Sequence, residues 1–333
     1  MERRVLYNSL RLHFQDDPDL DVEPWQVADY RHESVGSLIQ QLGSFEIYLD
    51  PSSFVAYADS CESPEQLTDE LLSDAKLEPE EADYIYLLIF ELWRRLLPEK
   101  QTTTLFCDEL DHQISHFDPD KLKSLEPLED ALANLQYLLN EEVDKGADPR
   151  ELFENIKDSC ANSIEDFLYD FIHFQIENNN HIFASEVLEG FNDYVDDPKW
   201  LALLKARLLV TTDPEEASLL VDNLLELTAE EQDIDFQIEF LTLLVQEGER
   251  DSFCRIVQTI LDLLETEDEL QDLLSLCEDY FHCLDDEENE EKIQAISSER
   301  EDIDLEESIN PKDSHIAQLK SLFIPNSKNN TTN

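Results

Sequence analysis

Glycine is the residue that this sequence lacks most clearly. Only 5 of the 333 residues are glycine, about a fifth of the ordinary usage of roughly 7%. Phosphate-binding loops, dinucleotide-binding turns and tight β-hairpins all need residues that tolerate a positive φ angle. The glycines stand alone, and no P-loop or GxGxxG spacing occurs. The shortage argues against nucleotide-binding α/β folds and hairpin-rich β folds.

Long apolar runs and paired cysteines are also missing. The longest apolar run, residues 84–90, is broken by Glu91 and Arg94 and falls far short of the ~20 residues that a membrane span needs. Arg11 and His13 occur before any continuous apolar stretch at the start of the sequence, so the first residues do not resemble a secretory signal. The cysteines form no CxxC pair. We therefore expect reduced thiols in a cytoplasmic protein.

Basic residues are scarce. Lys and Arg together number 23 against 80 Asp and Glu, which gives a formal net charge of −57. Such a charge repels phosphate and anionic membranes, whereas it attracts basic proteins and speeds their encounter at low salt. We expect a basic protein partner, with neither direct nucleic-acid binding nor membrane binding. Whether the acidity serves binding or only solubility stays open at this point.

What the sequence does contain is a set of helix starts. A capping residue followed by proline satisfies the free amides of a helix N-terminus. The pattern occurs at Ser63-Pro64, Asp148-Pro149, Asp197-Pro198 and Asp213-Pro214. Apolar residues then recur at intervals of three and four, and residues 79–97 are apolar over so much of their surface that we predict a central, buried helix. The sequence predicts an all-α fold.

Two parts of the chain are distinguished by their regularity. Residues 1–146 are expected to form a mostly helical N-terminal domain, although the segment from Phe45 to Leu49 is also compatible with a short strand. Gly146 suits a helix C-terminus and is followed at once by the cap Asp148 and Pro149. We place the domain boundary there, with a helical-repeat domain over residues 147–284.

The second part has a period of 35 residues. Expected first helices begin near Ser163, Pro198, Asp233 and Asp268, and second helices near His181, Pro214 and Asp251. The same step relates Leu168, Leu203, Ile238 and Leu273, then Phe171, Ala206, Leu241 and Leu276. Each repeat is therefore predicted to be an antiparallel helix pair that buries one face against the next pair, in a right-handed array.

This period and pairing resemble the tetratricopeptide class of repeats over residues 163–285. Trp200 and Ala217 lie near positions where that class uses Trp and Ala, whereas Leu204 and Phe240 stand where it has a small helix-packing residue. The resemblance implies a concave protein-binding surface. An ordinary helical domain whose similar helix lengths imitate a period remains the alternative.

The composition changes at residue 285. Residues 285–307 contain twelve acidic and two basic residues, a local charge of 2 − 12 = −10, which predicts a disordered acidic tail over residues 285–333. A short amphipathic helix is expected near 314–324. Its apolar side chains are the predicted partner-binding residues of a flexible arm: Ile316, Leu319, Leu322 and Phe323.

Candidate chemistry is sparse. Asp108, His112 and His116 are spaced four apart and would share one helix face, which makes them weak candidates for metal ligands. No HExxH motif accompanies them, and Leu110 and Ile114 mark the opposite face as buried, so a solvated helix face is favoured. No nucleophile elbow occurs. We predict no catalytic residues, no metal and no cofactor.

Basic residues near Arg4 and near Lys205 form two islands that we expect to pair internally with carboxylates, with a docking site as the alternative. The sequence thus indicates a non-catalytic scaffold, adaptor or escort chaperone that recognises a basic protein segment. A nucleic-acid mimic that sequesters a DNA- or RNA-binding protein is the alternative. A helical metalloprotein or hydrolase is a remote one.

Overall fold

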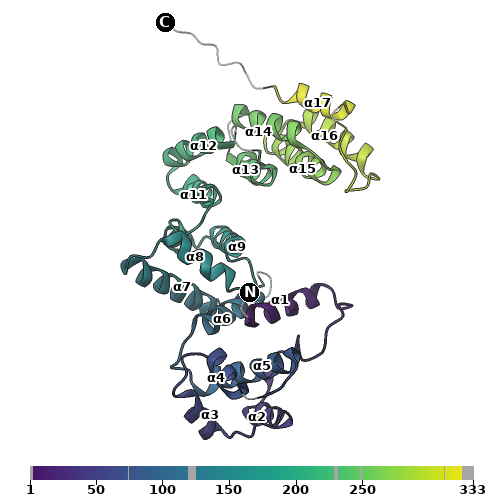
Figure 1. The fold of residues 1–333 in the computed structure, drawn as a ribbon. Helices are drawn as coiled ribbons and strands as arrows, with labels where there is room; N and C mark the ends of the chain where they lie inside the picture. The colour runs from purple at the N-terminus through teal and green to yellow at the C-terminus, as the bar shows by residue number, and fades with distance from the viewer. Residues whose placement is uncertain are drawn as a thin grey trace. The chain divides into compact units, whose positions relative to one another are not determined.

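The computed structural model describes residues 3–73, 75–118, 125–228, 232–247, 250–310 and 312–324. Over these residues the fold is all-helical and contains no strand, so the predicted all-α class is confirmed (Figure 1). The chain forms two compact units. Unit 1 comprises Met1–Phe174 and Gly190–Asp196, and unit 2 comprises Gln175–Glu189 and Asp197–Asn333.

The first helices of the chain belong to unit 1. They are α1 (Arg3–Asp16), the 3-10 helix η1 (Tyr30–His32), α2 (Val35–Ser44), α3 (Pro51–Ala58), α4 (Pro64–Leu72), α5 (Pro79–Leu96), α6 (Thr103–Ser115), α7 (Glu126–Asp144) and α8 (Pro149–Asp158). The boundary between the units runs through α9 (Ile164–Glu177) and α10 (His181–Phe191). Unit 2 continues with α11 (Pro198–Thr212), α12 (Pro214–Thr228), α13 (Ile234–Glu247), α14 (Arg250–Leu263), α15 (Glu267–Cys283), α16 (Glu287–Arg300) and α17 (Ser314–Leu322).

Helix α5 is the centre of unit 1. Pro79 opens it, Glu80 and Glu81 lie in its first turn, and two arginines lie in its last turn, as the helix dipole favours. Its side chains are buried continuously from Ile85 to Trp93, and α2, α4 and η1 pack against it. The predicted central helix is therefore confirmed.

The segment from Phe45 to Leu49 is not a strand. Glu46 has a φ angle of 63°, which interrupts extended backbone. The apolar side chains of Phe45, Ile47 and Leu49 pack onto the helical core of unit 1 instead.

The turn at Gly146 forms as predicted, but it lies within unit 1. Gly146 has a φ angle of 102°, and Asp148 accepts hydrogen bonds from the first amides of α8. Helix α7 packs against α8, and its Asn140 accepts a hydrogen bond from the hydroxyl of Tyr194 at 2.6 Å. The structure thus divides the chain later than the predicted boundary at residue 146.

The helices from α9 to α15 begin within one residue of the positions predicted from the sequence. First helices start at Ile164, Pro198, Ile234 and Glu267, and second helices at His181, Pro214 and Arg250. Within unit 2, α11 packs against α12 and α13, and α13 packs against α14 and α15. Leu203, Leu241 and Leu273 are fully buried in the core of unit 2. The predicted helix positions are confirmed, as is the burial of Leu203, Leu241 and Leu273, whereas Ile238 and Leu276 of the same columns are only partly buried.

The predicted disordered acidic tail is wrong for residues 287–300, which fold as α16, whereas the short helix predicted near 314–324 is confirmed as α17 (Figure 1). Ile293 and Ile296 of α16 are buried in the core of unit 2, while the acidic side chains Glu287 and Glu288 are exposed. Few apolar residues suffice here because α15 and α14 supply the surface that they cover. Residues 325–333 lie outside the described part of the chain.

Candidate functional site

The first metal candidate, Asp108, is buried beneath arginines. Its Oδ1 accepts hydrogen bonds from Arg4 Nε at 2.6 Å and Asn8 Nδ2 at 3.1 Å, and its Oδ2 accepts one from Arg31 Nη2 at 2.6 Å. Burial raises the pKa of Asp108, but the two guanidinium groups outweigh burial and lower it to about 2. The predicted solvated helix face is therefore wrong at Asp108, because α1 covers it.

The two candidate histidines, His112 and His116, lie beside each other. The ring centroids of His112 and His116 are 4.2 Å apart. Burial, together with the charges of Arg31 and His116, lowers the pKa of His112 to about 4. Among the residues that the structure describes, no group of three His, Cys, Asp or Glu side chains is arranged to hold a metal ion.

Asp111, which the sequence did not single out, joins α6 to the turn before α9. It accepts hydrogen bonds from the backbone amides of Ala161 and Asn162, at 2.9 and 3.0 Å, and from Asn8 Nδ2 at 3.1 Å. The partners come from distant parts of the chain, so no local pattern indicates them. These hydrogen bonds satisfy the acceptor oxygens of the buried Asp111 carboxylate and hold the turn before α9 against α6.

The cysteines are free thiols in the structure. Cys61, Cys107, Cys160, Cys254 and Cys277 are buried, and Cys283 is exposed. Cys277 therefore packs as a small hydrophobe. His282 lies 3.3 Å from Glu290 and is exposed.

Both basic islands pair internally, as predicted. Arg4 pairs with Asp108 in unit 1. In unit 2, Lys199 Nζ lies 3.0 Å from Asp197 and 2.9 Å from Asp233. Farther along α11, Lys205 lies 3.6 Å from Glu216, and Arg207 lies 2.9 Å from Glu239. The cations of α11 are thus engaged by neighbouring carboxylates.

The predicted partner-binding residues of the tail belong to the body of unit 2. Ile316, Leu319 and Phe323 are buried in its core, and Leu322 packs partly buried against it. The ring of Phe323 stacks on that of Phe281, with centroids 5.3 Å apart. These side chains are therefore not free to dock into a partner, which corrects the prediction of a flexible arm.

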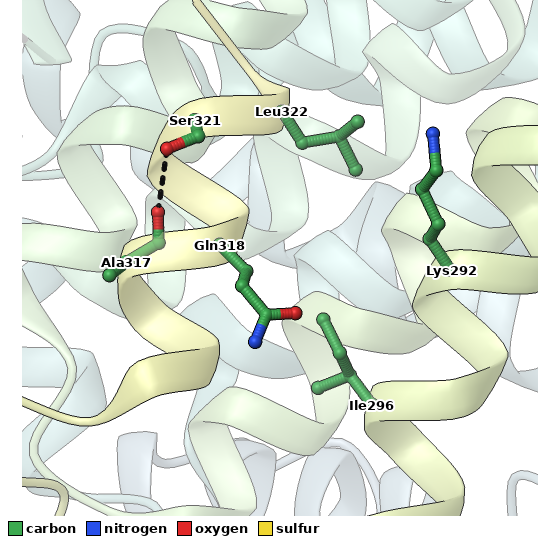
Figure 2. Close-up of a pocket in the computed structure, with 6 residues that line it drawn as sticks. All are labelled: Lys292, Ile296, Ala317, Gln318, Ser321 and Leu322. Atoms are coloured by element: carbon green, nitrogen blue, oxygen red, sulfur yellow. Dashed lines mark hydrogen bonds between the residues drawn. The ribbon is translucent and has the colours of Figure 1, made fainter.

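Packing of α17 beside α16 creates a groove of about 520 Å³. Figure 2 shows Ile296 and Lys292 on one side, from α16, and Gln318, Ser321 and Leu322 on the other, from α17. The Lys292 ammonium lies 2.8 Å from Glu288. The charged side chain that lines this groove is a cation, so the groove does not match a basic ligand.

A second groove of about 360 Å³ lies between α10 and α11. Its lining residues are His181, Ile182, Ser185, Glu186, Glu189, Leu208, Leu209 and Thr212. Ile182 is 80% exposed, so most of its apolar surface is in contact with solvent. The charged side chains that line this groove are carboxylates. It combines apolar surface with negative charge.

Comparison with protein-family models, with curated proteins and with solved structures found no match to this chain. Along the described ranges, no helix has both the length and the apolar character that crossing a membrane requires.

Proposed function

We propose that this protein is a non-catalytic scaffold, adaptor or escort chaperone that recognises a basic protein segment. The observation that supports the proposal is that Lys and Arg side chains of unit 2 form ion pairs within the unit. Several lie within ion-pairing distance of carboxylates of the same unit: Lys199, Lys205, Arg207, Lys292, Arg300 and Lys320. Asp and Glu outnumber Lys and Arg by 80 − 23 = 57 in the whole chain, so most carboxylates have no cation of the chain to pair with.

The proposed architecture of the binding domain is a right-handed, tetratricopeptide-like array of antiparallel helix pairs. The regular alternation of first and second helices between α9 and α15 supports it, as does the packing of α11 against α13 and of α13 against α15. Arrays of this kind offer extended surfaces on which a partner segment contacts several repeats.

Recognition would combine two physical contributions. The unpaired carboxylates attract a basic partner over about a Debye length and raise the rate of encounter. Apolar side chains then supply short-range anchors, which set the rate of dissociation. A phosphate-rich ligand is disfavoured by the same charge.

Co-purification of partners from the native cell, followed by mass spectrometry, tests the proposal. We expect a partner with a basic segment that remains bound at about 150 mM salt and resists competition by DNA. A nucleic-acid-binding protein that DNA displaces would favour the mimic instead. Turnover of a substrate with stoichiometric bound metal would contradict both functions.

A further inference from the structure

We infer that the groove between α10 and α11 is a docking site for a basic protein segment, which inserts an aliphatic side chain and places Lys or Arg against Glu186 and Glu189. This inference rests on the proposed function and assigns it a place on unit 2. A basic segment with an aliphatic side chain matches both the carboxylates and the apolar side chains that line the groove.

The α10 side of the groove is one continuous stripe. Ile182, Glu186 and Glu189 follow one another at intervals of four and three, so they lie on the same face of the helix. Leu208 and Leu209 of α11 form the apolar part of the opposite side. An aliphatic side chain that enters between them would contact Ile182 and cover its exposed surface, which favours binding through burial.

The charge at this place is uncompensated. Helix α10 contains no Lys or Arg, and neither does α12. The side chains of Glu186 and Glu189 make no ion pair or hydrogen bond with any residue that the structure describes. The cations of α11 lie within ion-pairing distance of carboxylates that belong to other segments than α10. A cationic side chain that reaches the groove therefore meets two carboxylates without an existing partner.

The lining favours a peptide segment over a small molecule. Pockets for small ligands usually enclose most of the ligand and include aromatic side chains. This groove has no phenylalanine, tyrosine or tryptophan among its lining residues, and both glutamates are exposed at its edge. Such a site would cover one side chain and leave the rest of the ligand in solvent, as a docked segment requires.

The test uses the full chain, at about 150 mM salt, and a fluorescent twelve-residue peptide made of four Arg-Leu-Lys triplets. A second peptide of four Arg-Ser-Lys triplets keeps the charge and removes the aliphatic anchors. We expect Ile182→Ser to raise the Kd for the leucine peptide about tenfold. The double variant Glu186→Gln/Glu189→Gln should raise it by a similar factor and should flatten its salt dependence.

Unit 2 offers matched controls on α12. Leu219 is 65% exposed and does not line the groove, so Leu219→Ser should leave the Kd unchanged. Asp222→Asn/Glu226→Gln removes two exposed carboxylates that lie four positions apart, about one helical turn, and should also have little effect. All of these positions are exposed, so we expect the fold to be retained, which melting curves verify.

The outcomes separate the groove from the proposed function. If the leucine peptide binds tightly but its Kd changes equally in the groove variants and the control variants, the groove is not the docking site. The proposed function would not be contradicted by that result. Equal affinity for the leucine and serine peptides would also overturn the groove as the docking site, because the aliphatic anchor would then contribute nothing. Absence of any basic partner in the co-purification would overturn the proposed function itself.

Discussion

The guanidinium of Arg300 in α16 lies against the carboxylate of Glu267 in α15, with Nε 2.8 Å from Oε1. Arg300 is 6% exposed and Glu267 is 1% exposed, so this ion pair is almost fully removed from solvent. Arg300 also contacts Asp313, immediately before α17, at 2.8 Å. One arginine therefore joins α15, α16 and the start of α17.

The first prediction concerns this arginine. Arg300→Met leaves the Glu267 carboxylate buried without its cation, and we expect a loss of about 3 to 5 kcal/mol in the free energy of unfolding of unit 2. Urea unfolding followed by circular dichroism measures the loss. Lys292→Met, which removes an exposed ion pair from the same helix, should cost less than about 1 kcal/mol. Equal effects of the two variants would contradict the buried role of Arg300.

The second prediction concerns the attachment of α17. Phe323 is 1% exposed, and its ring centroid lies 5.8 Å from that of Phe253. Phe323→Ala should therefore destabilise unit 2 by about 3 to 5 kcal/mol. Ile324→Ala is the matched control, because Ile324 is 65% exposed. A chain that ends at residue 310 should melt at a lower temperature than the full chain, and an unchanged melting temperature would show that α17 does not stabilise the body.

The third prediction tests the register of the helix pairs. Leu203 and Leu241 are both fully buried, and replacing either with Ala should cost about 2 to 5 kcal/mol. Chemical denaturation provides the measurement. Leu219→Ala, at an exposed position of α12, should be nearly silent. If the buried and exposed leucines proved equally tolerant, the helix faces would be assigned incorrectly.

How much of this fold is readable from the sequence depends on the range of the contacts. The starts of α11 and α12 are predictable because Asp197 and Asp213 cap them locally, each followed by proline. The burial of Asp108 is not predictable, because Arg4 and Arg31 reach it across 104 and 77 positions of the chain. Local pattern therefore locates helices, whereas long-range pairing decides which polar face is covered.

The C-terminal helices and the groove illustrate the same limit. In α16 the two buried isoleucines are surrounded by carboxylates, so composition alone indicates a solvated tail. Their burial follows from apolar surface on α15 that the local sequence does not reveal. Ile182 was not singled out by the sequence, because only the packed structure shows that this apolar side chain is exposed. The absence of Lys and Arg from α10 was the available signal for the groove.

The fourth prediction is a pH dependence in unit 1. The fold lowers the pKa of His112 to about 4, because burial and the charges of Arg31 and His116 disfavour its cation more than Glu109 and Asp29 favour it. Below the ordinary pKa of about 6.5, the unfolded chain takes up a proton at His112 that the folded chain does not bind. The free energy of unfolding of unit 1 is therefore unaffected by this group above about pH 6.5 and decreases as the pH falls toward about 4.

His112→Gln removes this titration, so the variant should lose less stability than the unmodified chain between pH 6.5 and 4. Thermal melts across this pH window make the comparison. His32→Gln serves as the control, because the His32 side chain is 88% exposed. A His112→Gln profile that runs parallel to that of the unmodified chain would contradict the assigned burial of this imidazole.

The central claim, that the acidic surface guides a basic partner to apolar anchors, is tested most directly by stopped-flow binding of the co-purified partner at several salt concentrations. Between about 10 and 150 mM salt the Debye length falls from roughly 30 to 8 Å. We predict that association slows markedly over this range while dissociation changes much less, because the anchors act at short range. An association rate that does not change with salt would contradict the claim.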